Sequence, residues 1–168
     1  MVRSVTLSLC LFLVIGCDIP DRVSRLEREN ADLKSQIERD HAARDFDLQG
    51  KCSKDAQAWF NQNWARDKDT EYLKFTNHYN RKSNGCFVVV EYHYSQPTGD
   101  KLITTWVNDV SLWNLYENDQ IGTFDERHTS NYHGNTQPED HVITCEVDQK
   151  KCSSLDGFYD LIRPYMSD

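Results

Sequence analysis

Hydrophobic and polar residues follow three different patterns along the chain, and each pattern predicts a different structure. Residues 5–15 form a nearly continuous apolar run. From about residue 20 to residue 44 the chain is densely charged, and its apolar residues recur at intervals of three and four, which is typical of one face of a helix. After residue 46, short runs rich in Val, Ile, Thr and aromatic residues indicate strands. We therefore expect an apolar leader, a long helical stalk and a mixed domain.

Residues 46–168 are expected to form one α+β domain. Ser53 can cap a helix over residues 53–66, in which Ala56, Trp59, Phe60 and Trp64 form one apolar stripe. Five runs indicate strands: 72–79, 86–94, 102–107, 110–117 and 141–147. Because the turns between them are short, neighbouring strands should be antiparallel. A second helix should begin at Ser153 or Ser154 and end near Pro164. We predict an antiparallel sheet of four to five strands with both helices on one face.

The apolar run near the start has the features of an export signal. Arg3 is the only charge in residues 1–16, and the apolar run of residues 5–15 follows it directly. A helix of this length would rise roughly 16 Å, whereas the hydrocarbon core of a bilayer is about 30 Å thick. We therefore interpret residues 1–16 as a cleaved signal peptide and not as a membrane span.

The residues that end this run carry a resemblance to a known family. Val14, Ile15, Gly16 and Cys17 resemble the lipobox of bacterial lipoproteins, and the resemblance covers residues 1–18 only. It implies that Cys17 receives a lipid (diacylglycerol, with palmitate-type acylation of the new amino terminus) and anchors the chain to a membrane. Several acyl chains on one residue satisfy the physical condition for stable anchoring. Asp18 resembles the residue that retains such proteins in the inner membrane of enteric bacteria, and so favours that membrane.

Charge sets further limits on partners and location. The chain has 19 Lys and Arg against 27 Asp and Glu, a net charge of −8. A protein that binds nucleic acid through phosphate contacts would be basic, so we expect no nucleic-acid partner. An acidic domain is also repelled by an anionic leaflet. Together with the lipobox, this predicts a lipid-anchored protein of the cell envelope whose domain faces the periplasm and stands away from the lipid.

The stalk, residues 17–45, contains a short heptad pattern. Its a and d positions are Val23, Leu26, Asn30, Leu33 and Ile37. The e and g positions provide two pairs of opposite charge for a parallel dimer, Arg22 with Glu27 and Glu29 with Lys34. The pattern ends after little more than two heptads, because Asp40 and Arg44 occupy the next d and a positions. A homodimer through residues 20–40 and a monomeric helical spacer are therefore both open interpretations.

Four cysteines lie in the domain, an even number in a chain with an export signal. We expect two disulfides, for which three pairings are possible. We favour Cys52 with Cys86 and Cys145 with Cys152, because each pair lies within one half of the domain. The alternative, a zinc site, is disfavoured because no pair has the spacing of two to four residues that thiolate zinc sites use. Disulfide bonding also leaves none of these thiols as a nucleophile. No cofactor is expected.

Few residues suggest catalysis. The polar stretch 125–141, interpreted as a loop, contains His128, His133, Asp140 and His141. These groups could hold a metal or support hydrolysis if at least two of them converged, but their spacing matches no closed metal site. The alternating acids Asp67, Asp69 and Glu71 lack the glycine and the later glutamate of a calcium loop. We expect no metal at either place.

Aromatic residues are the remaining candidates for function. Six of them exceed what two helices would bury: Tyr92, Tyr94, Trp106, Trp113, Tyr116 and Tyr132. Exposed Tyr and Trp suit protein interfaces and stacking on ligands, although core packing is the alternative for each. Three hypotheses follow. The domain binds an envelope protein or glycan without catalysis, it is a hydrolase that uses the 125–141 loop, or the protein is a scaffold that acts through stalk dimerisation.

Overall fold

The computed structural model describes residues 19–97, 103–131 and 139–168. Cys17, Asp18, Tyr132 and His133 therefore lie outside the described residues. The chain divides into two compact units, Met1–Phe46 and Asp47–Asp168. Each unit is described separately below, and α2 (Ile19–Asn63) contributes to both of them.

In the first unit the described residues are helical throughout. α2 begins at Ile19, with Pro20 and Asp21 in its first turn, where a proline and an acid are favourable. The large apolar residues of this part are exposed, each by about half of its surface or more: Ile19, Val23, Leu26, Leu33 and Ile37. No helix among the described residues is long and apolar enough to span a membrane.

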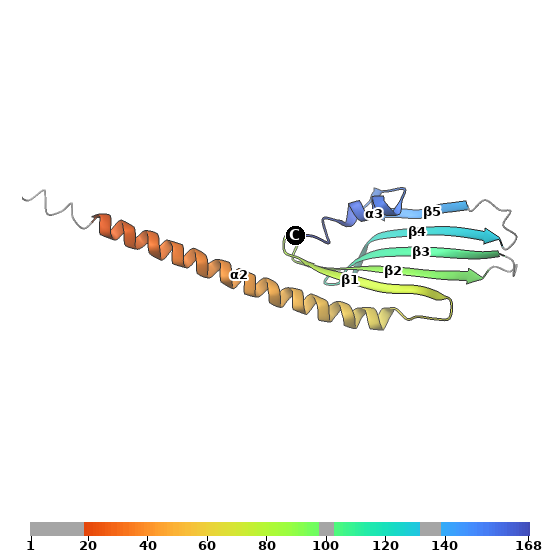
Figure 1. The fold of residues 1–168 in the computed structure, drawn as a ribbon, viewed down its shortest axis with the longest axis horizontal. Helices are drawn as coiled ribbons and strands as arrows, with labels where there is room; N and C mark the ends of the chain where they lie inside the picture. Colours follow the sequence, from red (N-terminus) through yellow and green to blue (C-terminus); the bar gives the residue numbers. More distant parts are fainter. Residues whose placement is uncertain (1–18, 98–102, 132–138) are drawn as a thin grey trace, which may run out of the picture. The chain divides into compact units, whose positions relative to one another are not determined.

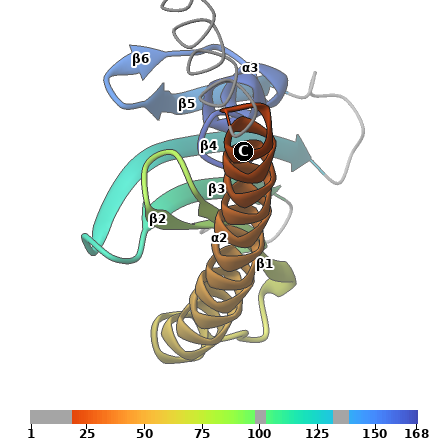
Figure 2. The same cartoon turned by 90° about the vertical axis from the view of Figure 1, so that its left-hand side faces the viewer.

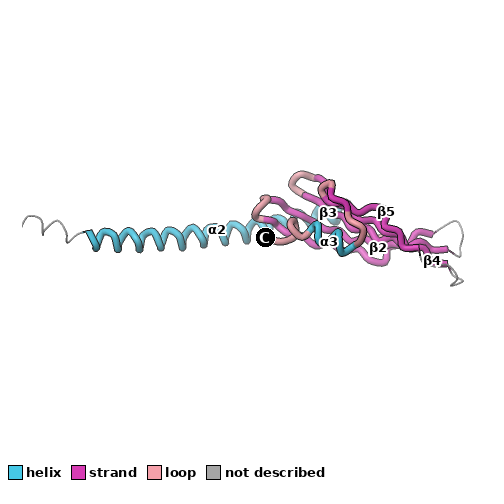
Figure 3. The backbone as a smooth tube through the Cα atoms, turned by 90° about the horizontal axis from the view of Figure 1, so that it is seen from above, coloured by secondary structure: helices cyan, strands magenta, loops and turns pink. Residues whose placement is uncertain are grey.

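In the second unit six strands form one antiparallel sheet in the order of the sequence (Figure 1). The strands are β1 (Thr70–Asn80), β2 (Gly85–Pro97), β3 (Ile103–Asn114), β4 (Asp119–Asn131), β5 (Glu139–Val147) and β6 (Lys150–Lys151). Figure 3 shows the strands running alongside one another. The predicted α+β class and antiparallel pairing are confirmed, but the predicted number of strands is too small.

The strand predictions fail at one end of the sheet. Residues 102–107 and 110–117 were expected to form two strands joined at Asn108 and Asp109, yet these two residues lie inside the single strand β3. β4 was not predicted, and residues 125–131 and 139–141 of the expected loop are strand residues. Polar residues occupy these stretches because this end of the sheet extends beyond the helices, as shown below. The sequence prediction looked for strands that alternate apolar and polar residues, and therefore did not identify these polar strand segments.

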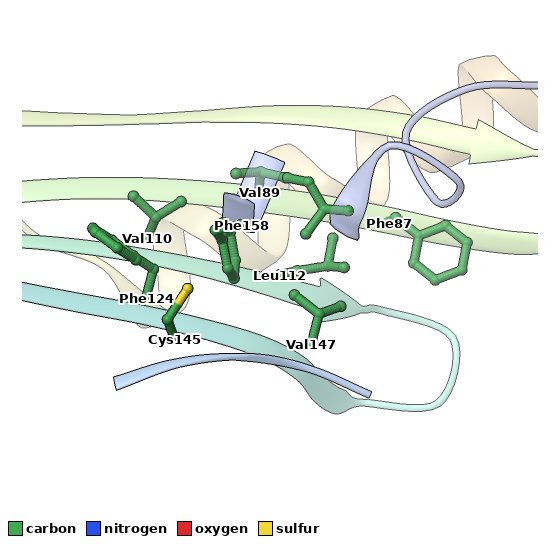
Figure 4. Close-up of a cluster of buried hydrophobic side chains, with 9 residues drawn as sticks. Phe87, Val89, Val110, Leu112, Phe124, Cys145, Val147 and Phe158 are labelled. Atoms are coloured by element: carbon green, nitrogen blue, oxygen red, sulfur yellow. The ribbon is translucent and has the colours of Figure 1, made fainter. Parts of the chain in front are cut away.

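Helices pack on both faces of the sheet, not on one face as predicted. On one face, Phe158 and Ile162 of α3 (Leu155–Ile162) are buried against Val89, Leu112 and other residues of β2–β5. Figure 4 shows the side chains of this cluster converging from the strands on Phe158. The alternating residues Val88 and Val90 of β2 face the opposite side, where the C-terminal part of α2 covers them.

The predicted break in the N-terminal helix is also absent. Helices were expected over residues 20–44 and 53–66, but α2 is continuous from Ile19 to Asn63. Its second part, from residue 47 onward, turns Ala56, Trp59 and Phe60 toward Val88, Val90 and Trp113 of the sheet. The Trp59 and Trp113 ring centroids are 5.3 Å apart. The apolar stripe assigned to the helix is therefore correct, although the helix boundaries are not.

Both expected disulfides are present. Cys52 and Cys86 join α2 to β2 and are fully buried, with a sequence separation of 34. Cys145 and Cys152 close the hairpin of β5 and β6, with a separation of 7, and Figure 2 shows this hairpin next to α3. The turn of the hairpin places Asp148 and Gln149 at positive φ, as a two-residue turn of type I′ requires.

Candidate functional site

The candidate site lies where the sheet continues past the helices. β2 and β3 pair as far as Pro97 and Thr104, and β3 and β4 as far as Ile103 and Asn131. The buried clusters under α3 and α2 reach only as far as Val110 and Val90, respectively, on the central strands. Beyond them the strands carry polar and aromatic residues on both faces. We call this part of the sheet the open end.

A hollow of about 150 Å³ lies on the α3 face of the open end. Strand register explains its composition, because His93, Asn108 and Glu126 are successive cross-strand partners in one row. Trp106 and His128 are also cross-strand partners, and each lies two residues along its strand from Asn108 and Glu126, respectively, so they point to the same face. Residues that follow one another across a sheet in this way share a face. The hollow is lined by Glu71, His93, Tyr94, Trp106, Val107, Asn108, Glu126 and His128.

The lining residues give the hollow a definite chemical character. Two carboxylates, Glu71 and Glu126, line it, and none of the lining residues within 19–97, 103–131 and 139–168 is a Lys or Arg. The Oδ1 atom of Asn108 is buried and has no hydrogen-bond partner among the described residues, so it is an acceptor whose bonding capacity is unused there. Trp106 is 36% exposed and offers an apolar surface beside these acceptors. The arrangement suits a ligand that donates hydrogen bonds and has an apolar face, and it disfavours an anion.

Neighbouring side chains hold one wall of the hollow in place. The Tyr72 ring lies 5.2 Å from the His93 ring, between centroids. The Lys74 ammonium lies over the Tyr72 ring and forms an ion pair with Glu91 at 3.0 Å. Burial, together with the Glu91 charge, raises the pKa of Tyr159 of α3 to about 12. A chain of contacts therefore links the hollow to the helix-covered part of the same face.

The opposite face of the open end carries a different group of residues. Tyr92 and Tyr94 stack with ring centroids 4.6 Å apart, and Trp64 packs edge-on against Tyr92. Across β3 and β4, Asp109 and Asp125 are register partners. Burial, followed by the Asp125 charge, raises the pKa of Asp109 to about 6. Burial and the charges of both aspartates also raise the pKa of Tyr94.

The six candidate aromatic residues do not form one surface. Trp113 and Tyr92 pack against the cluster under α2, as the core alternative predicted. Tyr116 is 40% exposed but lies at the other end of β3, under the Lys51 ammonium, which is 4.7 Å from the ring centroid. Of the five that the structure describes, Trp106 alone is both exposed and on the hollow's face of the sheet, whereas Tyr94 borders the hollow from the opposite face, where it stacks on Tyr92. Tyr132 lies outside the described residues.

Of the groups named for hydrolysis, the three that the structure describes lie on β4 and β5. His128 of β4 is the register partner of Asp140, and His141 of β5 is the partner of Arg127. Because His128 and Arg127 are consecutive in a strand, His128 and His141 leave the sheet on opposite faces. His133 lies outside the described residues. Within residues 19–97, 103–131 and 139–168, no three His, Cys, Asp or Glu side chains are grouped to hold a metal.

The alternating acids Asp67, Asp69 and Glu71 lie around the start of β1, and the first of them has a structural role. Asp67 Oδ1 accepts hydrogen bonds from the Asp69 amide at 3.0 Å and the Thr70 hydroxyl at 2.7 Å. These bonds shape the turn between α2 and β1, and they lower the pKa of Asp67. Glu71, the third acid, instead lines the hollow.

Sequence reasoning did not assign His93, Asn108 or Glu126 to a binding site. Their grouping depends on the register of β2, β3 and β4, and Asn108 was placed in a turn. One signal was available in the predicted strand lengths. The strand expected over residues 86–94 is longer than the neighbour expected over 102–107, whereas paired strands are usually of matched length. No protein-family model, curated protein or solved structure matches this chain. Its function must therefore be argued from the geometry above.

Proposed function

We propose that this chain is a lipid-anchored protein of the bacterial cell envelope whose domain binds a protein or cell-wall partner in the hollow at the open end, without catalysing a reaction. The anchor is Cys17, in the lipobox-like sequence, and the domain faces the periplasm. The observation that carries the binding role is the grouping of exposed Trp106 with the hydrogen-bond acceptors of Glu71, Asn108 and Glu126 around one hollow.

Hydrogen-bond chemistry narrows the class of partner. Carboxylates and the carbonyl oxygen of Asn108 accept hydrogen bonds only, so the partner supplies N–H or O–H donors. An indole face stacks on the apolar face of a sugar ring or on an apolar or cationic side chain. Peptide segments and the glycan strands of the cell wall both meet these conditions. A free phosphate or a nucleic acid fits less well, because the described lining residues include two carboxylates and no Lys or Arg.

The shape of the hollow favours recognition over hydrolysis. At about 150 Å³ it is smaller than the 300 to 1,000 Å³ typical of pockets for small-molecule ligands. A hollow of this size accepts one side chain or part of one sugar ring, as an anchoring contact within a wider interface does. His128 and His141 lie on opposite faces of the sheet, so these two histidines do not act on one bond.

The test places a photo-crosslinking amino acid at residue 106 of the full-length chain in its native envelope. We expect it to capture a discrete envelope protein or cell-wall fragments, identified by mass spectrometry. Tyr116 provides the matched control, because it is an aromatic residue of similar exposure that lies in the turn between β3 and β4, outside the hollow. Its crosslinker should give little or none of the same product.

One variant and one binding assay sharpen this experiment. Glu126→Gln removes a charge from the hollow and should reduce the yield from position 106 by at least about threefold, since a hydrogen bond to a charged group is typically worth more than 1 kcal/mol. Purified cell-wall sacculi, added to the full chain in detergent, test the glycan directly. The proposal is wrong if positions 106 and 116 capture the same material equally, or if position 106 captures nothing.

A further inference from the structure

We infer that the first part of α2 pairs with the same segment of a second copy of this chain, as a short parallel coiled coil. This inference does not depend on the hollow or its partner. Ile19, Val23, Leu26, Leu33 and Ile37 are between 47% and 60% exposed. They belong to none of the hydrophobic clusters formed by the described residues. A helix face with this much uncovered apolar surface is typical of an interaction site.

The structure extends the apolar seam by one position beyond the sequence prediction. α2 begins at Ile19, which is the d position before Val23. The a and d positions therefore read Ile19, Val23, Leu26, Asn30, Leu33 and Ile37. Five of these six residues are apolar, over about 27 Å of helix. The seam ends where Asp40 and Arg44 take the next d and a positions.

A groove on the same face matches the packing of a parallel coiled coil. It is lined by Val23, Leu26, Glu27, Asn30, Ala31 and Lys34. The first four are consecutive a, d, e and a positions, the set of four residues that receives a d side chain from the partner helix. In a parallel pair this incoming side chain is Leu26 of the second copy. The groove therefore has the form of a knobs-into-holes site.

Charge and polarity favour an identical, parallel partner. In such a pair Arg22 faces Glu27 of the second copy, and Glu29 faces Lys34, so both flanking contacts join opposite charges. Asn30 at an a position meets Asn30 of the second copy, where the two amides can bond to each other. In an antiparallel pair, a positions face d positions of the second copy. Asn30 would then face Ile19, Leu26 or Leu33, none of which can bond to its amide. Asn30 thus fixes both orientation and register.

Cysteine crosslinking in the full-length, membrane-inserted protein tests the pairing directly. Leu26→Cys places two thiols opposite each other across the seam, so an intermolecular disulfide should form under mild oxidation. Arg28→Cys is the matched control, because residue 28 is an f position on the outer side of the helix. The unchanged chain sets the baseline for its own cysteines. We expect a covalent dimer for Leu26→Cys at least about tenfold above the other two.

A second pair of variants separates the seam from simple crowding. In the Leu26→Cys chain, adding Leu33→Glu should reduce crosslinking at least about tenfold, which corresponds to 1.4 kcal/mol. Adding Ser24→Glu, an equal charge at an outer b position, should leave it unchanged. Equal crosslinking of Leu26→Cys and Arg28→Cys overturns the inference, as does no crosslinking at position 26. A crosslinked product whose mass shows a different protein as partner also overturns it.

Discussion

The two parts of α2 carry similar apolar stripes but differ in what covers them. Before residue 47 the stripe is exposed, with Leu26 at 60% and Leu33 at 59%. After residue 47, Cys52 and Ala56 are fully buried, and Trp59 and Phe60 pack against the sheet. Amphipathic spacing alone therefore does not show whether a helix face is buried within the chain. The first part has aliphatic residues at heptad positions, whereas the second is aromatic and carries a disulfide.

The sheet shows the same contrast between covered and uncovered regions. Where α2 and α3 cover it, both faces of β2 are apolar, as Phe87, Val88, Val89 and Val90 show. At the open end the same strands carry His93, Asp109 and Glu126. Among the described residues, the exposed side chains thus include apolar ones at heptad positions of α2 and polar ones around the hollow, besides isolated ones such as Phe46 and Ile143. The apolar heptad positions suit a second helix, and the polar hollow suits a partner that donates hydrogen bonds.

The largest expected effect comes from breaking the attachment of the second part of α2. Replacing Cys52 and Cys86 with alanine opens a 34-residue loop and should lower the free energy of unfolding by about 4 kcal/mol. Replacing Cys145 and Cys152 opens a 7-residue loop and should cost only about 2 kcal/mol. Urea unfolding of the two double variants measures the difference. Equal losses, or a larger loss for the hairpin, would contradict this account.

A smaller effect compares one apolar truncation in each part of the helix. Trp59→Ala removes the ring packed on Trp113 and should destabilise the domain by about 2 to 3 kcal/mol. Leu26→Ala removes a similarly apolar but exposed side chain, and should change domain unfolding by less than about 0.5 kcal/mol. Thermal unfolding followed by near-ultraviolet circular dichroism reports on the domain alone. A comparable loss for Leu26→Ala would show that the two parts are not energetically distinct.

The smallest effect concerns the uncovered sheet and depends on pH. Because the pKa of Asp109 is about 6 in the folded protein and near 3.8 when unfolded, the folded state holds its proton more tightly. Its contribution to stability is complete below pH 3.8 and is lost as the pH rises through 6. Asp109→Asn should therefore stabilise the domain at pH 7 by on the order of 1 kcal/mol, allowing for partial exposure, and have no effect at pH 3.5.

An exposed carboxylate provides the control for this pH prediction. Glu117→Gln, on the turn after β3, should change stability by less than about 0.5 kcal/mol at either pH. Unfolding free energies of both variants between pH 3.5 and 7.5 make the comparison. If Asp109→Asn destabilised the domain at pH 7, the carboxylate would be stabilised by contacts other than those described, and the sign of its role would be reversed.

Much of the covered part of the molecule could be predicted from sequence. The runs of 72–79 and 86–94 correspond to β1 and β2, and the stripe through Ala56, Trp59 and Phe60 is the face that packs. The open end could not be predicted, because polar residues such as Asn108 and Asp109 resemble a turn in isolation. Both residues are held in β3 because this strand pairs with β2 on one side and β4 on the other, through Asn108 and Asp109. The candidate site lies in this same region.

The sequence by itself determined the helical stripes and the antiparallel class, because these depend on spacing within a short segment or on short connections. It favoured the observed cysteine pairing among three possible ones. Only the tertiary structure decided that the two helices cover opposite faces and that Trp106, His93 and Glu126 surround one hollow. These results depend on strand register, which brings together residues more than 30 positions apart. Local patterns of polarity contain little information on such pairing, because polar residues such as Asn108 and Asp109 interrupt the alternation of buried apolar positions at the open end.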